Sequence, residues 1–389
     1  MPWQTLDLMS QRLDFVLLAA RGGVGFRELC RRFRISAPTG YKWMARYRAG
    51  GAAGLADRSR RPHRSPERYE GAVVDELLRL HTQWGWGGRK LHQRLRALGH
   101  EHVPAASTCT EILRRAGRFD AVPPPAQPYQ RYERAVPNEL WQMDHKGDFP
   151  TQAGPRCYPL TVLDDHSRYN LVLDAGERRD GPAVQGALTE AFARYGLPEA
   201  ILCDNAPPWG SPEPICPYTR FTVWLLRLGV RVLHGRPYHP QTQGKEERFH
   251  RTLQRELLSR HTWRDLAHCA REFPAYRQRY NTERPHDALG GHPPVSRYRP
   301  SVRALPPELP SLEYAGHMQV RRVRDGGTLT FGGQTWYIGR AFAGLPVGLR
   351  PSPQADGQHE VWFAEHRIGN IDLTAERQPK HTPRSIYQR

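Results

Sequence analysis

Cysteines, acidic residues and long apolar runs are all scarce in this chain of 389 residues, and each shortage excludes something. The six cysteines form no C-x-x-C pair and no close cluster with histidines. This argues against a structural zinc site and, at this chain length, against a disulfide framework. The apolar stretch 15–20 is far too short to cross a bilayer, and charges occupy the N-terminal segment where a signal peptide needs an apolar run. We therefore expect a soluble, intracellular protein with no membrane partner.

The shortage of acidic residues leaves a large positive charge. Lys and Arg number 57 against 39 Asp and Glu, a formal net charge of +18 that is spread along the chain. Such a distribution favours an extended polyanion as partner, and nucleic acid fits best because neutralised phosphates release their counterions. The plainer explanation is a basic proteome, since arginines far outnumber lysines.

Residues 1–50 are predicted to form a helix-turn-helix DNA-binding domain. Apolar residues recur at helical spacing in 11–20 and 26–33, and a short break precedes a third helix with Ser36 as its N-cap. An ordinary helical bundle with a solvated basic face is the alternative. A linker rich in Gly, Ser, Pro and Arg covers 51–68. The residues of the third helix that we assign to DNA contacts are Thr39, Lys42 and Arg46.

Residues 69–117 are predicted to form a second helix-turn-helix domain. Leucines at helical spacing follow the glycine-bounded entry WGWGG, and a last helix comes after a short turn. Two such units can read a longer DNA site than one. A proline-rich linker at 118–136 marks the boundary to the next domain. The outward-facing candidates for DNA contacts on the last helix are Ser107, Thr110 and Arg114.

The chain changes character from residue 137. Strand-like runs come first as a meander and then alternate with helical segments, which predicts for 137–300 an α/β domain with a mixed sheet and helices packed on it. Residues 315–375 alternate polar and apolar residues around Gly-Gly turns, which predicts a small all-β, barrel-like C-terminal domain. The expected fold class is therefore multidomain: helix-turn-helix units, an α/β core and a β domain.

Three acidic residues in the α/β region form the candidate catalytic site. Asp144 lies in the first strand, Asp204 ends the short apolar strand AILCD, and Glu247 lies one turn into a helix that begins near residue 243. Each alone is a weak signal, because acids at strand ends are common. Together they could hold Mg²⁺, which prefers carboxylate oxygens, and two such ions can stabilise both the attacking and the leaving oxygen of a phosphoryl displacement.

Five motifs in order carry a family resemblance: WQMDHKGDF, LTVLDDHSRY, CDNAPPWGSP, LGVRVLHGRPYHPQTQGKEERFHRTLQREL and YNTERPHDALGGHPPVSRY. They resemble the integrase core of the retroviral-integrase superfamily, as found in bacterial insertion-sequence transposases of the DDE type. The helical units and the β tail resemble the same group. The resemblance implies an RNase H-like fold and Mg²⁺- or Mn²⁺-dependent cleavage and joining of transposon ends. Its catalytic and metal-binding residues would be Asp144, Asp204 and Glu247.

The same resemblance carries expectations about partners. Double-stranded DNA, as transposon ends and as target, is the expected partner. Both ends must be held together, so we expect a dimer or a higher oligomer. The expected place is the cytoplasm of a prokaryotic cell, in association with the nucleoid.

The third acid is chosen by position. The glutamate three residues after the glycine of QTQG is Glu247, and it shares a helix face with Arg251 and Gln254. We expect Lys245, Arg251 and Gln254 to contact the bound DNA end, and Glu246 to be a solvated partner of a neighbouring basic residue. The opposite, apolar stripe of the same helix should pack on the sheet through Phe249, Leu253 and Leu257.

Two departures from the family pattern bear on function. The usual Asp-Asn-Gly reads Asp204-Asn205-Ala206 here, and an alanine is costly wherever the backbone needs a positive φ. The proline-rich loop that follows adds residues before Glu247, which need not move the site. Two alternatives stay open: a catalytically decayed or co-opted transposase acting as a sequence-specific repressor, and an RNase H-like nuclease without joining activity.

Other polar residues near the motifs are interpreted as supporting ones. Asp164 and Asp165 precede a turn, so we interpret them as structural residues or as partners that orient Arg168. Three histidines could contact phosphates or orient water, namely His234, His239 and His250.

Overall fold

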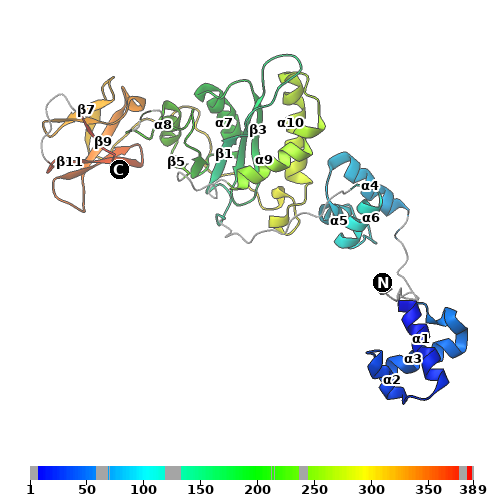
Figure 1. The fold of residues 1–389 in the computed structure, drawn as a ribbon. Helices are drawn as coiled ribbons and strands as arrows, with labels where there is room; N and C mark the ends of the chain where they lie inside the picture. Colours follow the sequence, from blue (N-terminus) through cyan, green and yellow to red (C-terminus); the bar gives the residue numbers. More distant parts are fainter. Residues whose placement is uncertain are drawn as a thin grey trace. The chain divides into compact units, whose positions relative to one another are not determined.

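The computed structural model describes residues 8–57, 69, 71–118, 133–211, 213, 215–235, 244–375 and 383–387 (Figure 1). The chain divides into two compact units, Met1–Arg68 and Tyr69–Arg389. Among the described helices, none has both the length and the apolar character that crossing a membrane requires.

The first unit contains the three predicted helices, α1 (Leu8–Arg21), α2 (Phe26–Arg32) and α3 (Ala37–Gly50). Ser36 caps α3 as predicted, because its hydroxyl accepts a hydrogen bond from the Thr39 N–H at 3.4 Å.

The packed part of this unit extends past the predicted boundary at residue 50. A 3-10 turn, Gly51–Leu55, buries Leu55 completely, and Arg12 of α1 donates to the Leu55 carbonyl at 2.8 Å. The predicted linker therefore begins too early, because an apolar side chain beyond residue 50 completes the core. Residues 58–68 of that linker lie outside the described part of the chain.

A second group of helices follows, with α4 (Ala72–Trp84), α5 (Gly88–Ala97) and α6 (Ala106–Arg115) around one apolar core. Helices α5 and α6 approach each other closely at Gly88, where an added Cβ would lie 2.3 Å from Thr110 Oγ1. Most of the proline-rich linker predicted at 118–136 falls on residues that the structure does not describe.

The α/β domain contains a five-stranded sheet in the order β3-β2-β1-β4-β5. Strands β1, β2 and β3 form an antiparallel meander, and β4 and β5 run parallel to β1. This mixed sheet confirms the prediction of a meander followed by alternating strands and helices. The strands are β1 (Trp141–His145), β2 (Tyr158–Asp164), β3 (Asn170–Gly176), β4 (Ala200–Cys203) and β5 (Arg231–His234).

Helices cover both faces of this sheet (Figure 1). On one face, α7 (Gly181–Tyr195) and α8 (Arg220–Arg227) share a core with alternate strand residues such as Trp141 and Met143. On the other face, α9 (Gly244–Glu256) and α10 (Leu266–Thr282) pack on β2 and β3. Because side chains alternate along a strand, Asp144 lies on the α9 face.

The C-terminal domain is all-β, as predicted, with sheets in the orders β11-β10-β9-β6 and β12-β8-β7. It continues past the predicted end at residue 375, because Ile386 beside β12 is buried in its core. Cys216 and Val223, from the loop after Asp204 and from α8, join the same core. The strands are β6 (Gln319–Arg322), β7 (Thr328–Phe331), β8 (Gln334–Tyr337), β9 (Pro346–Pro351), β10 (Gln358–Phe363), β11 (His366–Asp372) and β12 (Arg384–Ser385).

Candidate active site

Two neighbouring parallel strands bring the predicted aspartates together. Strand β1 pairs with β4 in the register Trp141↔Ile201 and Gln142↔Leu202. Continuing that register by two residues sets Asp144 beside Asp204, because parallel strands advance in the same direction. Both side chains fall on the α9 face of the sheet, so two acids distant in sequence share one edge of the site.

The electrostatics of Asp144 reflect this crowding. Its pKa is raised to about 6, first by burial and then by the negative charge of Asp204, with a smaller contribution from Glu247. A hydrogen bond that the carboxylate accepts from the His145 N–H, at 2.8 Å, acts in the opposite direction. The negative charges of Asp204 and Glu247 therefore both act on Asp144, and a cation among the three acids would offset this repulsion.

Asp204 is held by the proline-rich loop that was expected to add residues without moving the site. The Trp209 indole N–H donates to Asp204 Oδ1, and the Ala206 N–H donates to the same oxygen at 3.0 Å. The Trp209 ring is almost completely buried and stacks on His145 with ring centroids 5.3 Å apart. The insertion thus connects the two aspartate-bearing strands, a role that a tryptophan in a proline-rich loop could have signalled.

Ala206 fits its position without backbone strain. It is not among the non-glycine residues with positive φ, so the cost expected for an alanine in the Asp-Asn-Gly motif does not arise here. The tight position in this loop belongs to Gly210, where an added Cβ would lie 1.8 Å from the Asn205 carbonyl oxygen. The close approach of backbone that requires a glycine is therefore made by Gly210.

Trp209→Phe is expected to lower the rate of any DNA joining by roughly tenfold to 100-fold, the usual cost of removing a group that orients a metal ligand. Phenylalanine retains the stacked ring but cannot donate to Asp204. Joining and end binding should be measured in parallel, with binding unchanged. Trp263→Phe is the matched control, because it removes another buried indole N–H, bonded to the Leu258 carbonyl at 3.1 Å. Equal joining rates for the two variants would contradict the prediction.

Helix α9 presents the two faces expected of it. Its apolar stripe is buried against the sheet and α10, and Glu247, Arg251 and Gln254 are exposed together on the outer side. The Gln254 amide donates to the Ser259 hydroxyl at 3.0 Å, so its outward orientation is fixed. The buried stripe consists of Phe249, Leu253 and Leu257.

Glu246 does not behave as expected. It was predicted to be solvated, but its side chain is completely buried and accepts a hydrogen bond from the Thr161 hydroxyl at 2.9 Å. His250 lies one turn further along α9, with its Nε2 3.6 Å from the Glu246 carboxylate. Burial and the nearby Asp144 charge raise the pKa of Glu246 well above its usual range. The prediction of a solvated glutamate was wrong, because the first turn of α9 lies directly on β2.

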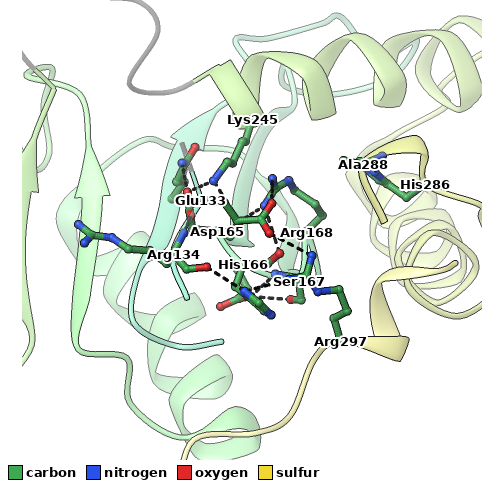
Figure 2. A network of polar contacts seen from close by, with 12 residues as sticks. Glu133, Arg134, Asp165, His166, Ser167, Arg168, Lys245, His286, Ala288 and Arg297 are labelled. Atoms are coloured by element: carbon green, nitrogen blue, oxygen red, sulfur yellow. Dashed lines mark hydrogen bonds and ion pairs between the residues drawn. The ribbon is translucent and has the colours of Figure 1, made fainter. Parts of the chain in front are cut away.

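Lys245 anchors the start of α9 to the β2–β3 turn. Figure 2 shows its ammonium group directed at Asp165, and it donates to both the carboxylate and the backbone carbonyl of that residue, the latter at 3.1 Å. The Asp165 carboxylate also accepts from the Gln142 amide at 2.7 Å and from the Arg134 N–H at 2.8 Å. The role of Lys245 as a DNA contact stays a prediction, and a contact with DNA would have to compete with this ion pair.

The rest of the network in Figure 2 ties the start of the core to the same turn. Arg168 binds Glu133 at 2.6 Å, and Arg297 binds the same carboxylate at 3.0 Å. Asp164 accepts from the Asn138 N–H at 2.8 Å and from the Ser167 N–H at 2.7 Å. These contacts support the interpretation of Asp164 and Asp165 as structural residues.

A shallow depression of about 440 Å³ lies along α9, and one of its lining residues, His250, lies 3.8 Å from the Asp144 carboxylate. Basic and amide groups line most of it, and two of the predicted DNA contacts, Arg251 and Gln254, are among them. The depression could receive a phosphate backbone next to the aspartates. Its lining residues are Lys146, His250, Arg251, Gln254, Arg255 and Ser259.

The predicted histidines have distinct environments. His250 Nδ1 lies 3.8 Å from Asp144 Oδ2, and burial lowers the pKa of this imidazole to about 3. His234 Nδ1 lies 3.0 Å from the backbone carbonyl of Asp204. His239 lies outside the described residues.

The predicted DNA contacts of α3 cluster around one tryptophan. The Lys42 ammonium and the Arg46 guanidinium lie 4.6 and 5.0 Å from the centroid of the Trp43 ring. The Thr39 hydroxyl lies 2.9 Å from that of Ser36, within the N-cap.

Sequence reasoning missed the most exposed aromatic of α3. Tyr41 is 61% exposed and stacks on Phe26 with ring centroids 4.3 Å apart. Its exposure beside Lys42, on the helix to which we assign the DNA contacts, makes it a further candidate for a groove contact.

On α6 the three predicted contacts separate. Ser107 is exposed, and Arg114 is exposed in an ion pair with Glu111. Thr110 was predicted to face outward, and this is wrong. Its hydroxyl donates to the Ala106 carbonyl at 2.9 Å, and the residue packs against Gly88 of α5. Because Gly88 has no side chain, α5 and α6 can approach each other closely at this point.

Comparison with known proteins agrees with this architecture. The family descriptions "Helix-turn-helix domain" and "Homeodomain-like domain" match residues 11–63 and 39–113. "Integrase core domain" matches residues 134–240 and 228–294. "IS481 family transposase, C-terminal domain" matches residues 318–379.

Three relatives cover parts of the chain. An uncharacterized protein of insertion element IS476 from Xanthomonas euvesicatoria is 27% identical over 58% of this chain and 63% of its own length. One of insertion element IS407 from Burkholderia multivorans is 32% identical over 40% of this chain and 53% of its own length. The Gag-Pro-Pol polyprotein of mouse mammary tumor virus is 30% identical over 31% of this chain and 6% of its own length. The chain thus spans less than two thirds of the length of these relatives.

Two solved structures are similar in outline. The simian T-cell lymphotropic virus intasome, in complex with PP2A regulatory subunit B56 gamma, contains a chain that matches 76% of this one and 98% of itself, with 15% identity and a TM-score of 0.39. The HTLV-2 integrase catalytic core domain in complex with magnesium matches 42% of this chain and 99% of itself, with 15% identity and a TM-score of 0.33.

The sequence matches define a chain with helix-turn-helix units ahead of an integrase core. In this combination it is similar to bacterial insertion-sequence transposases with an integrase-like core, and residues 318–379 match the C-terminal domain of IS481-family transposases.

Proposed function

We propose that this chain is a DNA transposase that binds the ends of an insertion sequence, cleaves at the 3′ ends and joins them to target DNA. One observation carries the proposal: Asp144 and Asp204 lie at neighbouring strand ends beside α9, whose exposed face holds Glu247 and Arg251. Acids and phosphate-binding groups side by side are what a metal-dependent phosphodiester reaction needs.

Asp144, Asp204 and Glu247 would hold Mg²⁺ or Mn²⁺, as two ions in the proposed arrangement. Their hard oxygen donors suit these cations. Burial and, after it, the charge of Asp204 raise the pKa of Asp144, and a bound cation would offset that repulsion. Within the described part of the chain, no three potential ligands are yet close enough to hold an ion. The exposed Glu247 side chain would therefore turn toward the aspartates on binding. When bound, the ions supply positive charge at the attacking and leaving oxygens of a phosphodiester.

The chain's own residues would position the DNA. Lys146 and Arg251 line the depression beside Asp144 and can neutralise backbone phosphates. Trp209 keeps Asp204 in place while the strand binds. Holding the strand in line with the acids supplies much of the acceleration in such a reaction. The helix-turn-helix units would read the element's terminal sequence, and a dimer or higher oligomer would hold its two ends together.

One assay tests the proposal. The chain is incubated with Mg²⁺ and a duplex that carries the element's end, with target DNA present. Joined product supports a transposase, cleavage alone points to a nuclease, and a gel shift with neither points to a DNA-binding repressor.

Asp204→Asn is expected to abolish joining while leaving end binding nearly intact, because the amide retains the size of the side chain but removes its charge. Binding and joining are measured on the same preparation. Joining at the wild-type level would remove Asp204 from the site.

A further inference from the structure

We propose that the Thr161 hydroxyl is a positioning group that fixes Asp144 and helix α9 relative to each other and thereby sets the affinity of the site for its metal. This inference rests on the proposed function. Thr161 lies on β2 directly opposite Asp144 of β1 and is completely buried beneath α9.

The hydroxyl of Thr161 reaches three groups from two other elements. Its Oγ1 lies 3.0 Å from the Asp144 backbone carbonyl, 2.9 Å from Glu246 Oε2 and 2.8 Å from His250 Nε2. A hydroxyl has one proton and two lone pairs, so it donates to one of the oxygens and can accept from the imidazole. A threonine that served only the strand would need none of these contacts.

Glu246 shows why the contact matters. A buried carboxyl is costly unless it is hydrogen-bonded, and Glu246 Oε2 accepts from Thr161 and lies 3.6 Å from His250 Nε2. The Leu163 backbone acts on the same carboxyl. The helix is therefore seated on β2 through a polar contact in its first turn, next to the acid assigned to the metal. The hydroxyl thus adds a second polar contact to the one that Lys245, in the same helix turn, makes with the β2–β3 turn.

His250 extends the contact to the side chain of Asp144. Its Nε2 faces Thr161 and its Nδ1 lies 3.8 Å from Asp144 Oδ2. The imidazole thus lies between the Thr161 hydroxyl and the Asp144 carboxylate that would bind the metal. Groups that orient metal ligands typically change metal affinity by tenfold to 100-fold when they are removed.

The test compares Thr161→Val with Thr161→Ser. Valine retains the branched shape that suits a strand and removes only the hydroxyl, whereas serine retains the hydroxyl. Mn²⁺ binding to the full chain is measured without DNA by electron paramagnetic resonance of the free ion. The Mg²⁺ concentration for half-maximal joining is measured separately. We expect Thr161→Val to raise the dissociation constant for Mn²⁺ and the half-maximal Mg²⁺ concentration about tenfold to 100-fold each. Both should stay near the wild-type values in Thr161→Ser.

Glu246→Leu guards against a folding defect. Leucine favours helix and removes both carboxyl oxygens, and an apolar side chain is easier to bury than a carboxyl. The affinity of the Glu246→Leu variant for Mn²⁺ should fall as well. If both Thr161→Val and Glu246→Leu bind Mn²⁺ like wild type, the inference is overturned while the transposase proposal stands. If the wild-type chain binds no Mn²⁺ and acts on no DNA end, the proposed function fails first and this inference fails with it.

Discussion

Glu247→Gln is expected to abolish both cleavage and joining, with a loss of at least about 10³-fold. Removing one metal-binding carboxylate costs several kcal/mol of transition-state stabilisation, and each 1.36 kcal/mol is about tenfold in rate. Glutamine retains the shape and helix propensity of the residue. Because Glu247 is exposed on α9, the substitution should leave the packing of the helix and the binding of DNA ends unchanged.

The comparison with Glu246→Gln decides which of two adjacent glutamates acts on the metal. Glu246 is buried and contacts Thr161, so its substitution should cost roughly tenfold to 100-fold, as expected for a residue that only orients the site. Glu190→Gln, on the exposed side of α7, is the control for a lost surface charge. Cleavage and joining are measured against Mg²⁺ for all three variants. A larger loss for Glu246→Gln than for Glu247→Gln would reverse the assignment.

Glu256→Gln is expected to lower the free energy of unfolding of the second unit by about 3–5 kcal/mol, the usual cost of breaking a buried ion pair on one side. Glu256 ends α9, and Arg284 donates to both of its carboxylate oxygens at 2.8 and 2.9 Å. The Trp86 indole N–H donates to the same carboxylate at 3.3 Å. The variant leaves the Arg284 cation buried without its counter-charge.

Calorimetry of the full chain measures this effect. A loss of this size lowers the melting temperature of a unit with a few hundred residues by on the order of 10 °C. Glu111→Gln is the matched control, because Glu111 pairs with Arg114 and Arg115 in an exposed setting worth less than about 1 kcal/mol. Equal melting temperatures for Glu256→Gln and the wild type would refute the assigned role of the pair.

The pH dependence gives the same prediction a second readout. Burial by itself acts to raise the pKa of Glu256, but the charge and hydrogen bonds of Arg284 outweigh it, and the pKa is lowered. A carboxyl with a lowered folded-state pKa stabilises the fold fully above its unfolded pKa and loses this contribution as the pH falls through the folded value. The difference between wild type and Glu256→Gln should therefore be full at neutral pH and shrink in acid, below the ordinary carboxyl range.

The sequence by itself determined the class and order of the domains, and it selected three acids as candidates. Hydrophobic periodicity placed the buried stripe of α9 at Phe249, Leu253 and Leu257, and the structure confirms it because a 3.6-residue repeat fixes one face of a helix whatever it packs on. Apolar runs ending in Asp144 and Asp204 predicted strands, and both acids follow or lie in strands. The spacing after the glycine of QTQG selected Glu247, which remains a prediction.

The same periodicity could have placed Glu246. It stands three and seven residues before Phe249 and Leu253, on the buried stripe, but its charge suggested solvent. What allows a carboxyl on that stripe is Thr161, which belongs to another strand and comes under α9 only through the register of β1 with β2. No local pattern contains that pairing.

Only the tertiary structure decided what surrounds the aspartates. The proline-rich loop looked like an insertion by its composition, and it became part of the site because Trp209 folds back onto Asp204 and His145. Lys245 was predicted to face DNA, yet it binds Asp165 across the first turn of α9. Side-chain partners of this kind depend on contacts between elements far apart in sequence, and these form only when the sheet and its helices pack together.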